Sequence, residues 1–328
     1  MTHNLLKEKF IALFEHKMSD EEMREFLLSI TLDKNTPIQT IATAAKVMQS
    51  YAIALPIKKE LQEKAIDIVG TGGDKIGSFN ISSTTALLVA STGAFVAKHG
   101  NRSITSKSGS ADMLEALGIR LDLGIEQSAK LLEESGFTFM FAQNHHPAMQ
   151  FIMPIRKSIN EKTIFNILGP LTNPAHIKKS MLGVFDKDFV PKMTQALKQN
   201  GATSALVVSS KEGMDEIGIS DITYASQLRD GVIHEFIIDP TEYGIKKMPL
   251  QAIMGGDAKE NAKILYNIFN NEATDAQRDI VLLNAAASFM VEGSARDMQD
   301  GLEIAKDAIL SNKAKEKLKQ IIEISNKL

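Results

Sequence analysis

The glycine-rich segment of residues 67–83, DIVGTGGDKIGSFNISS, contains four glycines and four hydroxyl side chains. It lies between the apolar run AIDIV and the helical pattern NISSTTALLVAS, so it connects a strand to a helix. Glycine lets backbone N–H groups approach an anion closely, and a helix N-terminus adds a favourable dipole. The segment lacks the third glycine of a dinucleotide-binding fingerprint and the Lys-Ser/Thr of a P-loop. We predict an anion site of another kind, rather than a plain turn in which Ser82 caps a helix.

A second polar segment, KHGNRSITSKSGSADMLEALG at 98–118, follows the apolar run AFVAKH. Lys98, Arg102 and Lys107 bring positive charge, and serine, threonine and asparagine side chains bring neutral donors. The segment begins at the end of a predicted strand, the edge at which open α/β sheets bind ligands. A basic, hydroxyl-rich loop that enters a helix suits a di- or triphosphate group. We favour this interpretation over a merely solvated loop.

Adjacent acids, Asp215 and Glu216, follow the predicted strand ATSALVV. Such a pair is often only solvated, and alone it is weak evidence for a site. It is also what Mg²⁺ requires, because this ion takes a few carboxylates together with substrate phosphate oxygens. Asp74 lies within the glycine-rich turn, where a carboxylate is unfavourable beside phosphate unless it meets a cation or a sugar hydroxyl. Two anion-binding loops make a divalent cation at the acidic pair more plausible.

The segment FAQNHHPAMQFIMPIRKSI at 141–159 contains two histidines and one arginine of interest. His145 and His146 have no carboxylate or third histidine at metal-binding spacing, which argues against zinc. Arg156 lies in a largely apolar stretch, where a guanidinium could pair with a planar carboxylate. An arginine that merely extends from a helix surface is an equally good interpretation of that residue alone.

The elements that position these residues follow an α/β pattern. The first 64 residues are predicted to be helical, with capping boxes at Ser19–Glu22 and Thr36–Gln39 and with Pro37 at a first helical position. From Ala65 onward, short apolar runs alternate with helical segments, which predicts a sheet covered by helices. Residues 220–239 are predicted to form two strands around an Arg-Asp-Gly turn, and the chain from about Ala258 to be helical.

Composition excludes several classes of protein. The chain has 328 residues, no Cys and a net charge of −3, so disulfides, thiolate catalysis and Cys-ligated zinc are excluded. The negative charge, the 6% aromatic content and the absence of Trp disfavour nucleic-acid binding. The N-terminal segment has the spacing of an amphipathic helix rather than a signal peptide. The longest uncharged stretch, 76–97, is broken by Asn80 and Gly93, so we expect no membrane span and a soluble, cytoplasmic protein.

Several of these motifs, taken in order, resemble one family closely. They are GTGGD at 70–74, FNIS at 79–82, KHGNRS at 98–103, SKSGSADMLEALG at 106–118, FAQNHHPAM at 141–149, TIFNILGPLTNPA at 163–175 and GMDEI at 213–217. Each is modest alone, but their succession from about residue 65 to 220 is highly specific. The chain is similar to the anthranilate phosphoribosyltransferases. That family transfers the phosphoribosyl group of phosphoribosyl pyrophosphate to the amine of anthranilate, with release of pyrophosphate, in tryptophan biosynthesis.

The resemblance implies roles for individual residues. The residues implied to bind phosphoribosyl pyrophosphate are Gly70, Gly73, Asp74, Ser78, Asn80, Ile81, Ser82, Ser83, Lys98, His99, Gly100, Asn101, Arg102, Ser103, Ile104, Thr105, Ser106 and Ser110. Those implied to contact anthranilate are Gly70, Asn101 and Arg156, with Arg156 facing its carboxylate. Ser82, Asp215 and Glu216 are implied to hold two Mg²⁺ ions. His99 and His146 are candidates to line the anthranilate channel, and we assign no residue as an acid or base.

The chain departs from the family pattern at three positions. Ser78 and Ser83 stand where Thr is expected, and Lys75 where a small residue is common. Both serines keep the hydroxyl, and a lysine does not disturb an anion site.

The resemblance also implies the fold of the nucleoside-phosphorylase-like phosphoribosyltransferases. A helical domain at 1–64, joined by a segment near 163–178, hinges against an α/β domain at 65–328 with a central, mostly parallel sheet, and the family forms homodimers. Two alternatives remain. One is a pyrimidine-nucleoside-phosphorylase-like enzyme that uses phosphate, against which KHGNRS and the paired acids argue. The other is a non-catalytic relative that binds nucleic acid, which should carry a basic surface.

Overall fold

A seven-stranded sheet lies at the centre of the computed structural model, which describes residues 2–102 and 107–328. Its strand order is β3-β2-β1-β4-β5-β6-β7. The strands from β3 to β5 run parallel, whereas β6 and β7 are antiparallel to their neighbours. The strands are β1 (Ile66–Gly70), β2 (Val96–Gly100), β3 (Phe137–Phe141), β4 (Lys179–Gly183), β5 (Ser204–Ser210), β6 (Thr223–Arg229) and β7 (Val232–Ile238). The predicted α/β class with a mostly parallel sheet is confirmed.

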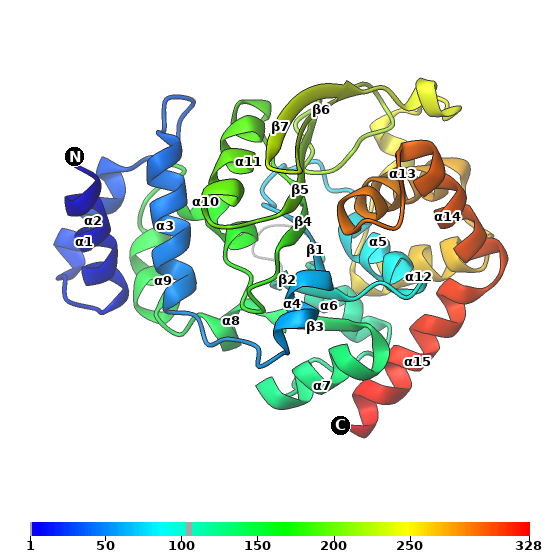
Figure 1. Ribbon diagram of the computed structural model, residues 1–328, viewed down its shortest axis with the longest axis horizontal. Coiled ribbons are helices and arrows are strands. Elements are labelled where there is room, and N and C mark those ends of the chain that lie inside the picture. The colour runs from blue at the N-terminus through cyan, green and yellow to red at the C-terminus, as the bar shows by residue number, and fades with distance from the viewer. Residues whose placement is uncertain (1, 103–106) are drawn as a thin grey trace.

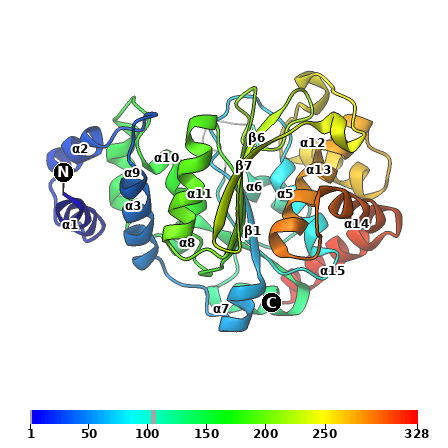
Figure 2. The ribbon, with the colours of Figure 1, turned by 45° about the horizontal axis from the view of Figure 1, so that its top comes forward.

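Helices cover both faces of this sheet (Figures 1 and 2). The N-terminal helices are α1 (His3–Phe14), α2 (Asp20–Ser29), α3 (Ile38–Ser50) and α4 (Lys59–Lys64). The central helices are α5 (Ile81–Ala90), α6 (Ser110–Ala116), α7 (Ile125–Ser135), α8 (Ala142–His145), α9 (Met149–Lys157), α10 (Phe165–Leu168) and α11 (Val190–Gln199). The C-terminal helices are α12 (Ala258–Phe269), α13 (Asp275–Glu292), α14 (Met298–Leu310) and α15 (Lys313–Lys327). Short 3₁₀ helices are η1 (Gly169–Leu171), η2 (Lys187–Phe189), η3 (Pro240–Tyr243) and η4 (Leu250–Ile253).

The sheet separates two hydrophobic cores because successive strand residues point to opposite faces. Val208 of β5 belongs to the core that contains α5, α13 and α14, whereas its neighbour Val207 belongs to the core that contains α1–α3, α10 and α11. Helices α5 and α13 lie directly on one face, and α11 lies on the other, with α3 outside it (Figure 2). Helix α9 packs against α1 and α2, so the helices at the left of Figure 1 share one core with that second face.

Two capping boxes, at Ser19–Glu22 and Thr36–Gln39, were predicted from the sequence. Ser19 Oγ accepts a hydrogen bond from the Glu22 N–H, and the Glu22 carboxylate accepts one from the Ser19 N–H, which confirms the first capping box. The second is wrong, because α3 begins at Ile38 with Pro37 as its N-cap. The Thr36 hydroxyl accepts instead from the Asp33 N–H at 2.9 Å, so it closes the preceding turn and is not available to the helix.

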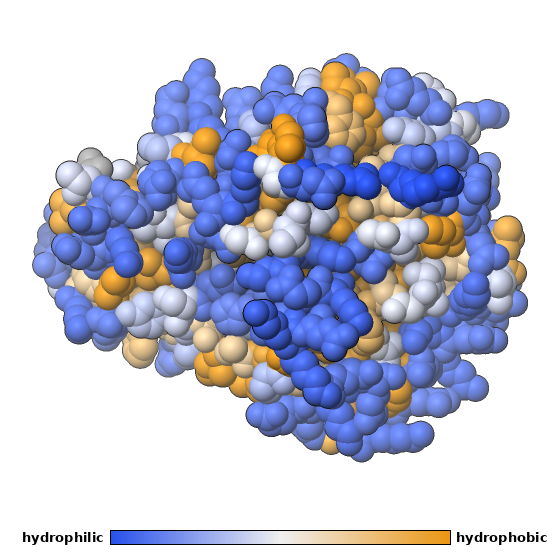
Figure 3. Space-filling model, viewed as in Figure 1, coloured by the Kyte–Doolittle hydropathy of each residue, from blue (hydrophilic) through white to orange (hydrophobic). Residues whose placement is uncertain are grey.

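The surface shown in Figure 3 is largely hydrophilic, with small scattered apolar patches. Within residues 2–102 and 107–328, no helix is both long enough and apolar enough to cross a membrane.

The close approach of α13 and α14 gives a test of the packing. A Cβ on Gly301 of α14 would lie 2.6 Å from the Ala286 carbonyl oxygen of α13. In an open helix, Gly→Ala stabilises by about 1 kcal/mol, whereas overpacking costs about 1–3 kcal/mol. We therefore expect Gly301→Ala to lower the free energy of unfolding in urea titrations. Lys306→Ala, an exposed change on the same helix, is the control; a more stable Gly301→Ala variant would contradict the packing.

Candidate active site

The acidic pair lies over the ends of two neighbouring strands. From β1 the chain continues outward to β2 and β3, whereas β4 and β5 lie on the other side of β1, so the β1/β4 boundary is a topological switch point. A Cβ at Gly70, the last residue of β1, would lie 2.2 Å from Asp215 Oδ2. A Cβ at Gly183, the last residue of β4, would lie 1.6 Å from the Asp215 carbonyl oxygen. Only glycine at both strand ends allows this approach, and the sequence analysis did not single out Gly183.

The glycine-rich segment holds both acids through backbone donors. The Gly72 N–H donates to Asp215 Oδ2 at 2.7 Å, and the Ser82 N–H at the start of α5 donates to Glu216 Oε1 at 3.0 Å. Gly72 and Gly73 have φ of +67° and +78°, a left-handed conformation that glycine adopts without a steric penalty. Lys75 shares this conformation with φ of +61°, so the departure from a small residue falls at a strained position.

The electrostatics of the acidic pair are unfavourable in the protein alone. Burial, followed by the neighbouring Asp74 charge, raises the pKa of Asp215 to about 7. Burial and the Asp215 charge raise the pKa of Glu216 well above its ordinary value. Neither carboxylate forms an ion pair with a Lys or Arg of the described chain. The buried Lys98 charge opposes the rise in the pKa of Glu216 without reversing it. Two crowded carboxylates that accept from backbone donors form a donor set suited to a hard divalent cation.

Lys98 lies beneath the site and is not part of an exposed loop. Its side chain is 1% exposed, and its ammonium donates to the Ile68 carbonyl and to Ser82 Oγ, the latter at 3.3 Å. Burial lowers the pKa of Lys98, although the surrounding acids oppose this effect. Lys98 therefore supports the N-terminus of α5 from inside the core.

Asp67, in the middle of β1, is a polar centre that the sequence analysis missed. Its carboxylate is fully buried and accepts from the His99 N–H at 3.2 Å and from Asn173 Nδ2 at 2.8 Å. Asn173 Nδ2 also donates to the Ala97 carbonyl at 2.9 Å. Burial raises the pKa of Asp67 to about 6, an effect that Lys98 partly offsets. The sequence feature that could have identified Asp67 is an aspartate within the apolar run AIDIV.

Two neutral histidines lie on the opposite face of β2 from Lys98. His99 Nδ1 donates to the Gly169 carbonyl at 3.1 Å, and the His99 and His146 rings are 5.2 Å apart between centroids. Burial lowers their pKa values to about 3 and about 4. The Nε2 atoms of both rings are buried and unpaired among the described residues. His145 differs, because its Nδ1 donates to the Ile53 carbonyl at 2.7 Å.

Arg156 is a guanidinium without an acidic partner in the part of the chain that the structure describes. It projects from α9 with its Cζ 5.2 Å from the Phe165 ring centroid, and its Nη1 lies 3.5 Å from Met153 Sδ. Burial lowers the pKa of Arg156 to about 10, still far above neutrality. A charged, partly buried guanidinium beside an aromatic ring can bind a planar carboxylate.

The N-terminus of α5 is held by elements from later in the chain. Asn80 Oδ1 accepts from Asn261 Nδ2 of α12 at 2.8 Å, and Asn80 Nδ2 donates to the Ser108 carbonyl at 3.2 Å. The Phe79 N–H donates to the Ile253 carbonyl at 3.2 Å, which joins the segment before α12 to the glycine-rich segment. Asn261 was also missed, since one asparagine in a helical pattern carries no sequence signal.

The remaining residues implied by the resemblance lie at the strand ends and the helix starts. Gly70 ends β1, Gly73, Asp74 and Ser78 lie in the segment after it, and Asn80–Ser82 lie at the start of α5. Lys98–Gly100 end β2, Asn101 follows it, and Ser110 begins α6. Ser83 is fully buried, and its hydroxyl has no partner among the described atoms. Arg102 is ion-paired to Asp112 and Glu115 of α6. Ser103, Ile104, Thr105 and Ser106 lie outside the described residues.

The family of this fold and site follows from comparison with known sequences. The pattern of the glycosyl transferase family, a/b domain, matches residues 62–315. The chain is 40% identical to an anthranilate phosphoribosyltransferase of Xanthobacter autotrophicus, an alignment that covers 99% of this chain and 94% of the relative. It is 39% identical to that of Aquifex aeolicus, with the same coverage. The chain is therefore a member of this glycosyl transferase family.

Comparison with solved structures gives the same family. Anthranilate phosphoribosyltransferase from Thermus thermophilus matches with a TM-score of 0.92 at 34% identity, covering 99% of this chain and 96% of that one. The enzyme from Saccharomyces cerevisiae, in complex with PRPP and Mg, matches with a TM-score of 0.86 at 25% identity, covering 99% and 93%. Within the glycosyl transferases, the chain belongs to the anthranilate phosphoribosyltransferase family.

The raised pKa of Asp67 predicts a pH dependence of stability. Because its pKa is about 6 in the folded protein against an ordinary 3.8, the folded state binds the proton more tightly. Stability from this group is therefore lost as the pH rises from about 4 through about 6. We expect wild type to lose up to about 3 kcal/mol relative to Asp67→Asn over that window, measured by urea unfolding. Parallel pH profiles for the two proteins would contradict the assignment.

Proposed function

We propose that this protein transfers the phosphoribosyl group of 5-phosphoribosyl 1-pyrophosphate to the amine of anthranilate, giving N-(5-phosphoribosyl)anthranilate and pyrophosphate in tryptophan biosynthesis. The observation that carries the proposal is the acidic pair Asp215–Glu216, held at the β1/β4 switch point by Gly72 and Ser82. The yeast relative, whose structure contains PRPP and Mg, supports it.

Phosphoribosyl pyrophosphate would bind along the carboxyl edge of the sheet. The proposed contacts on one side come from Gly70, Gly73, Asp74 and Ser78 and from the first turn of α5, Asn80–Ser83. The end of β2, Lys98–Asn101, and Ser110 at the start of α6 supply the other side. Ser103–Ser106 belong to the same proposed site by resemblance alone.

Two Mg²⁺ ions are proposed to be held by Asp215, Glu216 and the Ser82 hydroxyl. Across residues 2–102 and 107–328, no group of three or more His, Asp or Glu side chains could hold a metal unaided. That is consistent with Mg²⁺, which is commonly bound by one or two carboxylates plus substrate phosphates. The structural reason for the assignment is the burial and crowding of the two carboxylates, which raise both pKa values in spite of the nearby Lys98.

The reaction breaks the bond between ribose C1 and pyrophosphate, so positive charge develops on the sugar and negative charge on the leaving group. The glycine-rich segment and the N-terminus of α5 stabilise the leaving group with fixed N–H donors. When bound, Mg²⁺ would neutralise developing charge on the pyrophosphate. Anthranilate's amine is a neutral, weak nucleophile, so orientation by Arg156 and Asn101 would supply the rest. His99 and His146 would line its channel as neutral imidazoles.

We also propose the organisation that the resemblance implies: a helical domain at 1–64, joined by a segment near 163–178, against the α/β domain at 65–328. Helices α1–α3 share one core with α9–α11 and with residues of β1, β4 and β5, so the division itself rests on the resemblance. A homodimer formed through the helical domain would cover Leu5 and Leu28, which are 45% and 37% exposed. The proposed location is the cytoplasm.

The experiment that tests the function measures pyrophosphate release from phosphoribosyl pyrophosphate with Mg²⁺, with and without anthranilate. We expect release only when anthranilate is present, with one pyrophosphate released for each anthranilate consumed. Consumption of a pyrimidine nucleoside with inorganic phosphate, and no reaction with anthranilate, would replace the proposal with the phosphorylase alternative.

Arg156 determines recognition of the acceptor in this proposal. A guanidinium can form two parallel hydrogen bonds to the ortho carboxylate and so fix the direction of the amine. We expect Arg156→Ala to raise the KM for anthranilate strongly and that for phosphoribosyl pyrophosphate little, with partial recovery in Arg156→Lys. Lys157→Ala, an exposed change on the same helix, is the control. Equal effects on both substrates would make Arg156 a structural residue.

The acidic pair is expected to act through metal. The double variant Asp215→Asn, Glu216→Gln should lose activity and its dependence on Mg²⁺ concentration while keeping its far-UV circular dichroism. Asp221→Asn, which removes an exposed ion pair with Lys211, is the matched control in the same loop. A double variant with an unchanged Mg²⁺ titration curve would place the metal elsewhere.

A further inference from the structure

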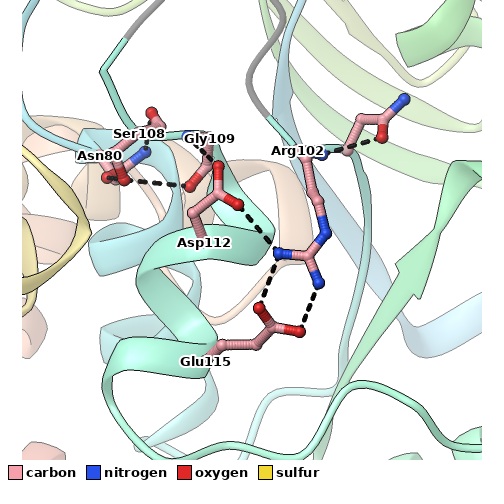
Figure 4. Close-up of polar contacts among 7 residues, drawn as sticks. Asn80, Arg102, Ser108, Gly109, Asp112 and Glu115 are labelled. Carbon is pink, nitrogen blue, oxygen red and sulfur yellow. Dashed lines mark hydrogen bonds and ion pairs between the residues drawn. The ribbon is translucent and has the colours of Figure 1, made fainter.

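Arg102, at the carboxyl end of β2, is engaged by two acids of α6 (Figure 4). Its Nη1 and Nη2 donate to the two oxygens of Glu115 at 2.7 and 2.6 Å, and Nη1 also donates to Asp112 Oδ1 at 3.0 Å. This is the bidentate geometry of a strong arginine–carboxylate pair. Its Cζ also lies 5.7 Å from the Phe141 ring centroid.

The charge of this cluster opposes a direct phosphate contact. One guanidinium and two carboxylates sum to a negative charge, so the intact cluster repels a pyrophosphate group. The Nη1 and Nη2 groups of Arg102, which would donate to a phosphate, already donate to Glu115. A phosphate could reach Arg102 only by displacing Glu115 from both of its hydrogen bonds.

The main chain around Arg102 makes separate hydrogen bonds, which orient Asn101 and connect it to α6. Its N–H donates to Asn101 Oδ1 at 2.8 Å, which fixes the orientation of that side chain. The Asn101 carbonyl accepts from the Ala111 N–H at 3.4 Å, in the first turn of α6. Asp112 Oδ2 accepts from the Gly109 N–H at 2.8 Å, at the start of that helix. The cluster thus joins the end of β2 to the start of α6.

The connection continues to the N-terminus of α5. Ser108, beside Gly109, donates through Oγ to Asn80 Oδ1 at 3.2 Å and accepts from Asn80 Nδ2 through its carbonyl (Figure 4). Two of the residues proposed to bind substrate, Asn80 and Asn101, therefore share one hydrogen-bonded framework with the cluster.

We propose that Glu115, assisted by Asp112, is a positioning residue for the substrate site. It holds Arg102 against α6, and Arg102 sets the geometry of Asn101 and of the first turn of α6 instead of binding phosphate. This inference rests on the proposed function, because it concerns affinity for phosphoribosyl pyrophosphate. It predicts that loss of the negative charge at Glu115 weakens binding of a polyanion, the reverse of the simple electrostatic expectation.

The test compares Glu115→Gln and Glu115→Asp with wild type, using phosphoribosyl pyrophosphate with Mg²⁺ in calorimetry and steady-state kinetics. Either variant loses the bidentate pair, so we expect the Kd and the KM for phosphoribosyl pyrophosphate to rise about fivefold. The kcat should stay within about twofold of wild type, because the reacting atoms are untouched. Asp122→Asn, which breaks the 2.7 Å Arg120–Asp122 pair near α7, controls for loss of a surface ion pair and should change neither constant.

Tighter binding in Glu115→Gln would overturn the inference, because it would show that Glu115 competes with phosphate for Arg102. Unchanged binding in both variants would overturn it as well. The proposed function fails by a different result: wild-type protein that neither binds phosphoribosyl pyrophosphate nor releases pyrophosphate. Normal wild-type binding beside an unaffected Glu115→Gln variant overturns this inference alone.

Discussion

The contact of the Asp215 main chain with the ends of β1 and β4 is the constraint on which the rest of the site depends. Gly70 and Gly183 leave no Cβ, so the segment that carries both acids lies directly on the switch point of the sheet. From there the Asp215 and Glu216 carboxylates reach the Gly72 and Ser82 N–H groups. One close packing contact thus brings the acids and the glycine-rich backbone together. Burial raises the pKa of both acids, and the neighbouring carboxylates raise it further.

Strand β2 separates the two proposed substrate sites, which lie on its opposite faces. Lys98 points toward α5 and supports Ser82, on the side proposed for the pyrophosphate. His99, the next residue, points toward Gly169 and His146, on the side proposed for anthranilate. The segment after η1 connects this second side to the helices, because Asn173 binds Asp67 through its amide and accepts from Gln49 of α3 through its carbonyl. Alternation along one strand therefore places both halves of the reaction at one sheet edge.

Much of the fold and part of the candidate site were predictable from the sequence, because strand ends and glycine turns have strong local signals. The mostly parallel arrangement was implied by the family resemblance, whereas the helix-covered sheet, the β6–β7 hairpin and the helical C-terminus followed from short apolar runs and turn residues. Long-range polar contacts did not. Neither the Asn261–Asn80 bond nor the Gly183 contact has a pattern within its own segment. Positive charge in the sequence was also a poor guide to position. Lys98 was expected in a basic loop, but it lies buried on the inward face of β2. Arg102 is paired with acids ten and thirteen residues further along the chain.

The central claim is that the acidic pair holds metal against the pyrophosphate at the β1/β4 boundary. Crystals grown with phosphoribosyl pyrophosphate and Mn²⁺ in place of Mg²⁺ allow the metal to be located by its anomalous scattering. The account predicts anomalous peaks bonded to the carboxylates of Asp215 and Glu216 and to pyrophosphate oxygens, with the glycine-rich segment donating to the same group. Peaks bonded only to other side chains, or a pyrophosphate bound away from this boundary, would contradict it.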